Sequence, residues 1–544
     1  MGFEMGARLK GMRWSGAWMA GALLLALPAM AAGDQPSPAV AIDVDPPAPL
    51  VIDPPVRETI RLGRETAGSL PDRLDLPEPP QVVVEVPPPE APAAAPAKTA
   101  EAVSEPRAES AADRLAAAIQ RRVADPALPL PPKFGANERE GLSAAYAAER
   151  HRALWIEDGA WNKAAESLID RLGRADEDGL DPGDYPVPRL AAGEPGAEDL
   201  AEAELKLSAA AYLYARDARG GRIDPRRIGG LVTPRLDLPG VERVLATLAA
   251  SEDAGAALGG FNPGYPGYAA LREKLAELRA ARPQGEARRG RAGTRLASSG
   301  EARVSSRWSP RLEGDLIANM ERWRWLPSRV GERYILVNIP EFRLRLIEDG
   351  RMIHEARVIT GSPSTPTPVF SHVMEYAIVN PSWFIPPSIL RKDVLPGLAR
   401  DPGYAARRGY QVTQRRGVTS VRMPPGPRNA LGYIKFMFPN DHAVYLHDTP
   451  NRGLFGGSSR ALSHGCVRLE HPFALGGKIL GPAWSEARLK GLIGRGERTI
   501  MLSEPLPIHL AYFTTMVDEY GELRTFGDVY GYHRRVRLAL GLGA

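Results

Sequence analysis

The spacing of hydrophobic and polar positions changes along the chain and divides it into two predicted domains. From residue 108 to 282, alanine and leucine recur at helical spacing, in stretches such as LSAAYAAERHRALWI and AELKLSAAAYLYARDARGG. From residue 313 to 505, short apolar runs such as RYILVNI and AVYLHDT alternate with turn residues. The first pattern indicates a helical domain and the second a β-rich domain. We therefore predict a multidomain α+β protein.

Several local features refine this division. The β-rich domain is predicted to open with an amphipathic helix from Leu316 to Trp325, and a polar insertion at about 383–432 is typical of a lid beside an active site. The segment 506–544 is expected to pack on one of the two domains. In the helical domain, three aromatic residues allow a ligand groove or ordinary core packing, and we favour packing: Trp155, Trp161 and Tyr212.

Three segments do not have the pattern of a folded domain. Residues 1–31 combine a basic start, an apolar run and a small-x-small site at Ala29-Met30-Ala31, which predicts a signal peptide and export to the periplasm. An uncleaved membrane anchor is the alternative for this segment. Residues 32–107 are rich in proline and alanine and predict a disordered linker. Residues 283–312 are basic and low in apolar content, which predicts a second linker.

Composition narrows the class of protein. The chain has 544 residues, of which 44% are hydrophobic and 25% charged, and this balance excludes wholesale disorder and a polytopic membrane protein. The 69 basic and 65 acidic residues nearly cancel, so nucleic acid is not the expected partner. The single cysteine, Cys466, excludes an intrachain disulfide framework.

Cys466 is the candidate nucleophile of the chain. His447 ends a strand-like run, and nineteen residues later comes Cys466, within the sequence Ser463-His464-Gly465-Cys466-Val467-Arg468. A free thiol is only a few per cent ionised at neutral pH, so a cysteine nucleophile needs a base, and His447 can supply one. That base needs an acceptor on its second ring nitrogen, for which the carbonyl of Asp448 or a nearby side chain is available.

Neighbouring residues suit the same reaction. The amides of Gly465 and Cys466 are candidates for stabilising an oxyanion, and Arg468 suits a substrate carboxylate. A zinc site built from His442, His447, His464 and Cys466 is disfavoured, because His442 and His447 would point to opposite faces of a strand. We predict no metal and no cofactor. An inert, buried cysteine remains the simplest alternative.

These residues resemble the motif of the L,D-transpeptidases, in which a histidine and a glycine-rich interval precede Ser/Thr-His-Gly-Cys, a hydrophobic residue and Asn or Arg. The stretches NMERWRWLP, NPSWFIPPSI and PPGPRNALGYIKFMFPN extend the resemblance to the large, lid-bearing Gram-negative branch of the family. The GLDP and GRIDP stretches are similar to its helical scaffold domain. The resemblance covers about residues 137–535.

The resemblance implies a peptidoglycan enzyme that forms 3-3 cross-links. Cys466 would attack a tetrapeptide stem, release its terminal D-alanine and pass the acyl group to the diamino acid of a second stem, with His447 as base and then proton donor. Trp383, Tyr445 and Arg468 match positions that contact the donor stem. His464, Ser463 and Asp448 are implied to support the catalytic pair, and carbapenems are implied to acylate the thiol.

One departure concerns attachment to the wall. The branch carries a peptidoglycan-binding module, and residues 283–315 contain nothing similar. We expect the proline-rich segment, the scaffold domain or a cell-wall synthesis protein to provide the attachment. The alternative functions are an L,D-carboxypeptidase, an enzyme that attaches proteins to peptidoglycan, and a non-catalytic wall-binding scaffold.

Overall fold

The computed structural model describes residues 109–190, 193–282, 302–303 and 308–543. The predicted signal peptide, the predicted proline-rich linker up to residue 107 and most of the predicted second linker lie outside these residues. No helix within the described ranges is both long enough and apolar enough to cross a membrane.

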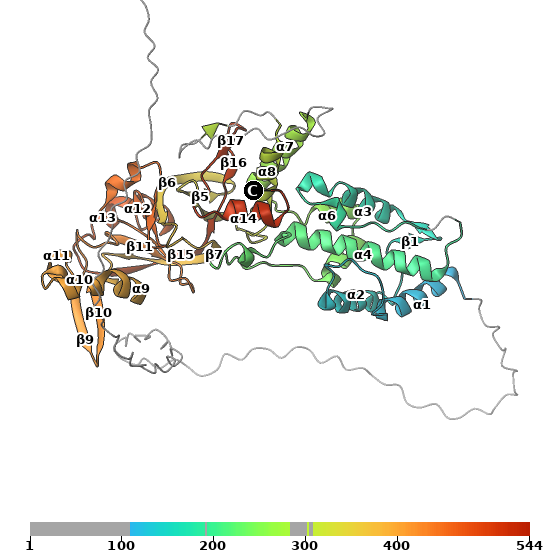
Figure 1. Ribbon diagram of the computed structural model, residues 1–544, viewed down its shortest axis with the longest axis horizontal. Helices are drawn as coiled ribbons and strands as arrows, with labels where there is room; N and C mark the ends of the chain where they lie inside the picture. The colour runs from blue at the N-terminus through green and yellow to red at the C-terminus, as the bar shows by residue number, and fades with distance from the viewer. Residues whose placement is uncertain (1–108, 191–192, 283–301, 304–307, 544) are drawn as a thin grey trace, which may run out of the picture. The chain divides into compact units, whose positions relative to one another are not determined.

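The first half of the described chain is helical and is built around one long helix, α4 (Ala197–Gly220) (Figure 1). Its alanine-rich surface lets neighbouring helices approach closely, and most of its residues are buried. The other elements of this half are α1 (Ala111–Ala124), α2 (Ala136–Ala148), β1 (Ile156–Glu157), β2 (Ala160–Trp161), α3 (Lys163–Gly173), η1 (Ala175–Asp178), η2 (Pro182–Asp184), η3 (Pro225–Arg227), α5 (Val241–Ala249), α6 (Ala254–Gly259) and α7 (Pro266–Ala280).

The aromatic residues of this half belong to its core. Trp155 is fully buried, and its indole N–H donates to Ser208 Oγ at 2.6 Å. Tyr212 is also buried and packs edge-on against Phe134, while Trp161 is partly buried against the same cluster. The core-packing interpretation is therefore correct, and these side chains do not form a groove.

The second half is built on a nine-stranded sheet in the order β13-β6-β14-β12-β11-β7-β15-β4-β5. An additional pairing of β5 with β6 links the last strand of this order back to the second, which gives the sheet a closed, barrel-like path. Its strands are β4 (Arg333–Asn338), β5 (Arg343–Glu348), β6 (Arg351–Gly361), β7 (Phe370–Val379), β11 (Ile434–Met437), β12 (Leu446–His447), β13 (Ala461–Ser463), β14 (Val467–Leu469) and β15 (Arg498–Ala511).

Helices and a small sheet surround the main sheet. The small sheet has the order β16-β17-β3. The elements are β3 (Ala302–Arg303), α8 (Pro310–Trp323), η5 (Arg452–Gly456), α12 (Pro472–Ile479), α13 (Glu486–Lys490), β16 (Thr515–Val517), β17 (Leu523–Thr525) and α14 (Tyr532–Ala539).

The predicted insertion forms a separate substructure, which we call the lid. Its three strands have the order β8-β10-β9, and the β9–β10 hairpin projects from the main sheet (Figure 1). A small apolar cluster centred on Ile385, Leu390, Val394 and Val421 holds it together. The lid consists of β8 (Trp383–Phe384), α9 (Pro387–Ile389), the π-helical turn η4 (Leu390–Val394), α10 (Leu395–Arg400), α11 (Tyr404–Arg408), β9 (Gln411–Arg415) and β10 (Val418–Met423).

Two predicted boundaries are wrong. The division at 505/506 falls inside β15, which pairs with both β7 and β4 and has a register shift between Met501 and Leu506. The helix predicted from Leu316 begins earlier, because Ser309 caps it by accepting from the Leu312 amide.

The helical half also contributes to the core of the β-rich half. Ile223, Ile228 and Val232 belong to the same buried cluster as the strands of the main sheet. Val232 forms a parallel bridge with Val369, directly before β7. The segment after α4 therefore packs as part of the second core, although its sequence follows a helical region.

Candidate active site

Two neighbouring strands bring the histidine and the cysteine of the motif together. β12 and β14 pair in parallel, with Leu446 opposite Val467 and His447 opposite Arg468. The Val467 amide donates to the Tyr445 carbonyl at 3.1 Å. This register places Cys466, one residue before β14, beside the strand that ends in His447.

His447 is buried, and its ring orientation is determined by the main chain. Its Nδ1 lies 2.5 Å from the carbonyl oxygen of Asp448. A carbonyl can only accept, so Nδ1 carries the proton and Nε2 keeps a free lone pair. Burial, together with the positive charge of Arg468, lowers the pKa of His447 to about 3. The imidazole is therefore neutral at neutral pH and able to accept a proton.

Cys466 is a free, partly buried thiol. Burial raises its pKa above the ordinary value, while hydrogen bonds from Tyr445 and the charges of Arg468 and Lys435 act in the opposite direction. With the thiol pKa raised and the His447 pKa lowered, the resting pair consists of a neutral thiol and a neutral imidazole. Its proton can leave as the sulfur attacks, which is general-base chemistry.

A chain of donors leads from the lid to the thiol. Trp383 and Tyr445 both lie close enough to affect the next group along: Trp383 lowers the pKa of the Tyr445 hydroxyl, and the Tyr445 hydroxyl lowers the pKa of the Cys466 thiol. The Tyr445 ring also packs edge-on against His447, with the ring centroids 5.7 Å apart. Tyr445 thus contacts both members of the predicted pair, and Trp383, the first residue of β8, links the pair to the lid.

Two residues near the nucleophile, Lys435 and Thr367, were not predicted from the sequence. Lys435 pairs with His447 across β11 and β12, and its ammonium lies 5.5 Å from the centroid of the Tyr445 ring. Burial lowers its pKa, and the nearby Cys466 raises it. Lys435 lies in the quoted GYIKFMFPN stretch, but only the strand pairing reveals that it faces the thiol.

The loop before Cys466 is held by hydroxyl groups. Gly465 has φ of +112°, a conformation that other residues rarely adopt. Its carbonyl accepts from Thr367 Oγ1 at 2.7 Å, and its amide donates to Ser463 Oγ at 3.1 Å. Ser463 Oγ also donates to the Cys466 carbonyl at 2.5 Å. Of the two predicted oxyanion donors, the Gly465 amide is therefore engaged, whereas the Cys466 amide has no partner within the described residues.

Asp448 acts through its main chain rather than its side chain. Its buried carboxylate accepts from the Tyr433 amide at 2.9 Å and pairs with Arg452 at 2.8 Å. Burial raises the pKa of this carboxyl. Of the two acceptors left open for His447 by the sequence, the structure places the Asp448 carbonyl on the ring.

Arg468 and His464 lie on either side of the thiol in the sequence. Arg468 is partly buried, and its Nε has no partner within the described part of the chain. Burial lowers its pKa, and Cys466 raises it. His464 is half exposed and reaches the lid, with its Nε2 3.2 Å from Asp393 Oδ2 in η4.

His442 lies apart from this group. Its Nε2 is 2.7 Å from Thr233 Oγ1, and its ring packs against Phe370. The described residues contain no group of three or more histidine, cysteine or acidic side chains placed to hold a metal ion.

A family model matches part of each half of the described chain. Residues 332–479 match the family model of the L,D-transpeptidase catalytic domain, and residues 140–275 match that of the Scaffold domain. No peptidoglycan-binding module was found.

One curated relative and two solved structures illustrate the similarity. A Haemophilus influenzae protein named "Putative L,D-transpeptidase" is 36% identical over 246 residues, which are 41% of this chain and 49% of the relative, so the chain spans about half of that protein. The L,D-transpeptidase from Mycobacterium smegmatis is 15% identical with a TM-score of 0.18, over 33% of this chain and 58% of that chain. An Enterococcus faecium L,D-transpeptidase mutant is 16% identical with a TM-score of 0.17, over 33% of this chain and 50% of that chain.

Proposed function

We propose that this chain, which carries an L,D-transpeptidase catalytic domain behind a helical Scaffold domain, forms 3-3 cross-links in peptidoglycan through a Cys466 thioester. The observation that carries the proposal is the site itself. The pairing of β12 with β14 brings Cys466 and His447 to neighbouring strands, and the His447 imidazole is neutral with its Nδ1 at the Asp448 carbonyl, so that Nε2 is left to accept the thiol proton.

The first half-reaction forms the thioester. Cys466 Sγ attacks the carbonyl between the third residue of a donor stem and its terminal D-alanine, and His447 Nε2 takes the thiol proton. The Cys466 amide is the donor available for the oxyanion that develops. When the C–N bond breaks, His447 returns the proton to the leaving amine, and free D-alanine departs.

The second half-reaction transfers the acyl group. The side-chain amine of the diamino acid on another stem attacks the thioester, and His447 takes a proton from that amine. Collapse of the intermediate breaks the C–S bond, and the proton on His447 returns to the sulfur. Arg468 and Lys435 place positive charge near the thiol, which favours the thiolate that leaves and suits the carboxylates of a stem peptide.

The remaining assignments extend this proposal. Trp383 and Tyr445 contact the donor stem from the lid side, and His464 connects the lid to the nucleophile loop through Asp393. We place the reaction in the periplasm, in keeping with the signal peptide predicted for residues 1–31. The partners are the donor and acceptor stem peptides.

Mass spectrometry of the products tests the function. The active chain and a Cys466→Ala control are incubated with purified disaccharide-tetrapeptide. A dimer joined through two diamino acids, absent from the control, is the expected product. Disaccharide-tripeptide alone would make the enzyme an L,D-carboxypeptidase, and an unchanged substrate in both samples would contradict an active site at Cys466.

Acylation by a carbapenem provides an independent readout of the thiol. The expected result is a covalent adduct on Cys466 that is absent in Cys466→Ala and strongly slowed in His447→Gln, because the substituted side chain cannot take the thiol proton. Equal adduct formation by the His447→Gln chain would contradict the role of His447 as base.

A further inference from the structure

A cavity lies in the Scaffold domain, among residues that the active site does not use. It has a volume of about 540 Å³ and is lined by residues of α3, η1, α6 and α7 and by the loop between α6 and α7. This volume lies within the range of about 300 to 1,000 Å³ that is usual for small-ligand sites. Its lining is mixed, with charged side chains beside glycine, alanine and proline residues.

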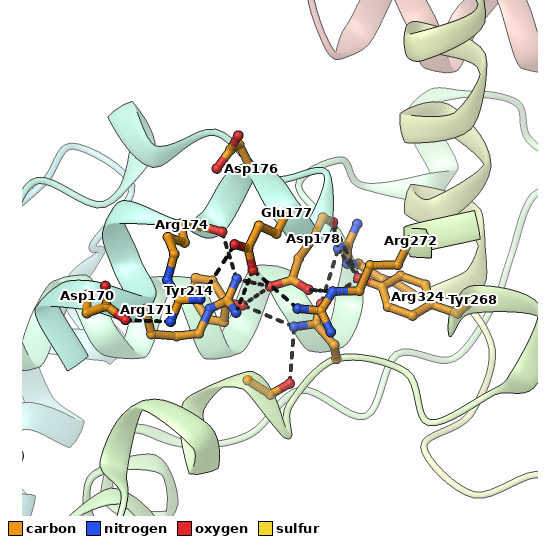
Figure 2. A network of polar contacts seen from close by, with 12 residues as sticks. Asp170, Arg171, Arg174, Asp176, Glu177, Asp178, Tyr214, Tyr268, Arg272 and Arg324 are labelled. Carbon is orange, nitrogen blue, oxygen red and sulfur yellow. Dashed lines mark hydrogen bonds and ion pairs between the residues drawn. The ribbon is translucent and has the colours of Figure 1, made fainter. Parts of the chain in front are cut away.

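The inner wall of the cavity is a rigid network centred on Asp178 (Figure 2). The buried Asp178 carboxylate accepts from Arg171 at 2.6 Å, from the Tyr214 hydroxyl at 2.5 Å and from Arg272 at 2.9 Å. Its carbonyl accepts from Arg324, at the end of α8, at 2.5 Å. These bonds fix the wall without a ligand, as a preorganised site requires.

The outer part of the cavity is accessible and carries both signs of charge. Arg174 pairs with Asp170, and both side chains are more than half exposed. Asp253 accepts from Ser167 Oγ at 2.5 Å. Three arginines and three aspartates line the cavity, so their formal charges cancel; they are Arg171, Arg174, Arg272, Asp170, Asp178 and Asp253. This balance does not favour an anion or a cation.

Two features favour a ligand rich in hydroxyl and amide groups. Hydrogen-bond donors and acceptors both line the cavity, and a sugar residue offers both kinds of group. Arg171 is only 7% exposed, and its Nε has no partner within the described residues. In addition, the loop side is lined by Gly259, Gly260 and Gly264, which leave room for a flat ring to approach the backbone.

We propose that this cavity binds the saccharide chain of peptidoglycan, a polymer of N-acetylated amino sugars, and so holds the enzyme on the wall. The inference rests on the proposed function, because that function makes peptidoglycan the polymer within reach. It assigns wall attachment to the Scaffold domain in a chain in which no peptidoglycan-binding module was found.

A glycine substitution can block the cavity without disturbing the fold. A Cβ on Gly264 would meet no atom within 4 Å, and the residue does not have a positive φ. Because Gly264 lines the cavity, Gly264→Phe is expected to place a ring at its opening. Gly230→Phe is the matched control, because Gly230 is exposed and equally open but does not line the cavity.

The binding experiment uses the full chain with Cys466→Ala and a β-1,4-linked hexamer of N-acetylglucosamine as the probe, measured by calorimetry. We expect the parent and Gly230→Phe to bind with the same Kd and Gly264→Phe to bind at least tenfold more weakly, with an unchanged circular dichroism spectrum. The same loss is expected for retention on isolated sacculi. Undiminished binding by Gly264→Phe would overturn the proposal.

The experiments distinguish a failure of the saccharide-site proposal from a failure of the proposed transpeptidase function. If the hexamer does not bind while the active chain still forms the 3-3 dimer from disaccharide-tetrapeptide, the saccharide site is wrong and the proposed function stands. If the hexamer binds in a Gly264-dependent way but no dimer forms, the saccharide site stands. Binding of the sugar-free tetrapeptide in place of the hexamer would also overturn the proposal, because it would make the cavity a peptide site.

Discussion

The carbonyl oxygen of Asp448 lies 2.5 Å from Nδ1 of His447, whereas the carboxylate of the same residue faces Tyr433 and Arg452. The orientation of the base therefore depends on a main-chain atom that no side-chain substitution removes. The carboxylate instead anchors the turn that carries this carbonyl. The roles of the two oxygen-bearing groups of Asp448 can be separated by experiment.

Asp448→Asn is expected to leave carbapenem acylation within about threefold of the parent, because the main-chain acceptor is preserved. The variant weakens a buried contact with Arg452, which we expect to cost about 1 to 3 kcal/mol of unfolding free energy. Acylation kinetics and chemical denaturation measure the two effects. Loss of acylation in a folded Asp448→Asn protein would show that the carboxylate has a direct role.

The pH profile of acylation distinguishes a neutral pair from an ion pair. The pKa of His447 is lowered to about 3 and that of Cys466 is raised, so neither group titrates between pH 5 and 8. The acylation rate constant should therefore vary by no more than about twofold across this range. A tenfold rise per pH unit through neutrality would instead indicate a thiolate formed before attack. A carbapenem whose own ionisation is constant over this range is the suitable probe.

Tyr445→Phe removes the hydroxyl that lowers the pKa of the Cys466 thiol and can donate to the thiolate. A hydrogen bond to a charged group contributes about 1.5 to 3 kcal/mol, so acylation is expected to slow by about tenfold or more. The apparent pKa of the thiol, followed by alkylation with iodoacetamide, should rise, because the thiolate loses a donor. Trp383→Phe is the graded control: it removes the indole N–H that lowers the pKa of Tyr445 and should have a smaller effect on the thiol. Equal thiol pKa values in Tyr445→Phe and the parent would contradict this arrangement.

Gly465→Ala tests the backbone conformation beside the nucleophile. The nearest atom to a Cβ at this position would be 3.6 Å away, so space is available, but φ is +112°. Strain alone should cost about 1 to 2 kcal/mol and displace the Cys466 amide, which lowers the acylation rate. Gly453→Ala, at an open position without positive φ, should have no such effect. A fully active and equally stable Gly465→Ala protein would contradict the inferred strain.

Features that depend on local sequence patterns could be predicted, whereas features that depend on contacts between distant parts of the chain could not. Alanine-rich helical spacing and strand alternation are local patterns, and both domain types could be predicted from them. The division at 505/506 failed because the pairing of β15 with β7 and β4, which continues the strand across this point, is a non-local interaction. The packing of Ile223 and Val232 into the second core depends on contacts far along the chain, which local periodicity does not contain.

The active site also has parts that could be predicted from the sequence and parts that depend on the fold. Spacing and residue type were enough to select Cys466 and His447, because a thiol nucleophile needs a base and the glycine-rich interval allows the chain to return. The acceptor for Nδ1 could not be chosen, since a carbonyl and a carboxylate of one residue are equivalent in a sequence. Lys435 was missed because its proximity to the thiol comes from the pairing of β11 with β12.

By itself the sequence determined which chemical groups are available: one thiol, a histidine at the end of a strand-like run and a glycine that permits positive φ. It also determined two regions with different hydrophobic periodicity. The tertiary structure alone decided how these groups meet. It set the parallel register of β12 and β14, directed the Asp448 carbonyl to His447 and engaged the Gly465 amide with Ser463. The physical reason is that hydrogen bonds are directional and strand pairing is non-local, so the partner of each donor depends on the whole fold.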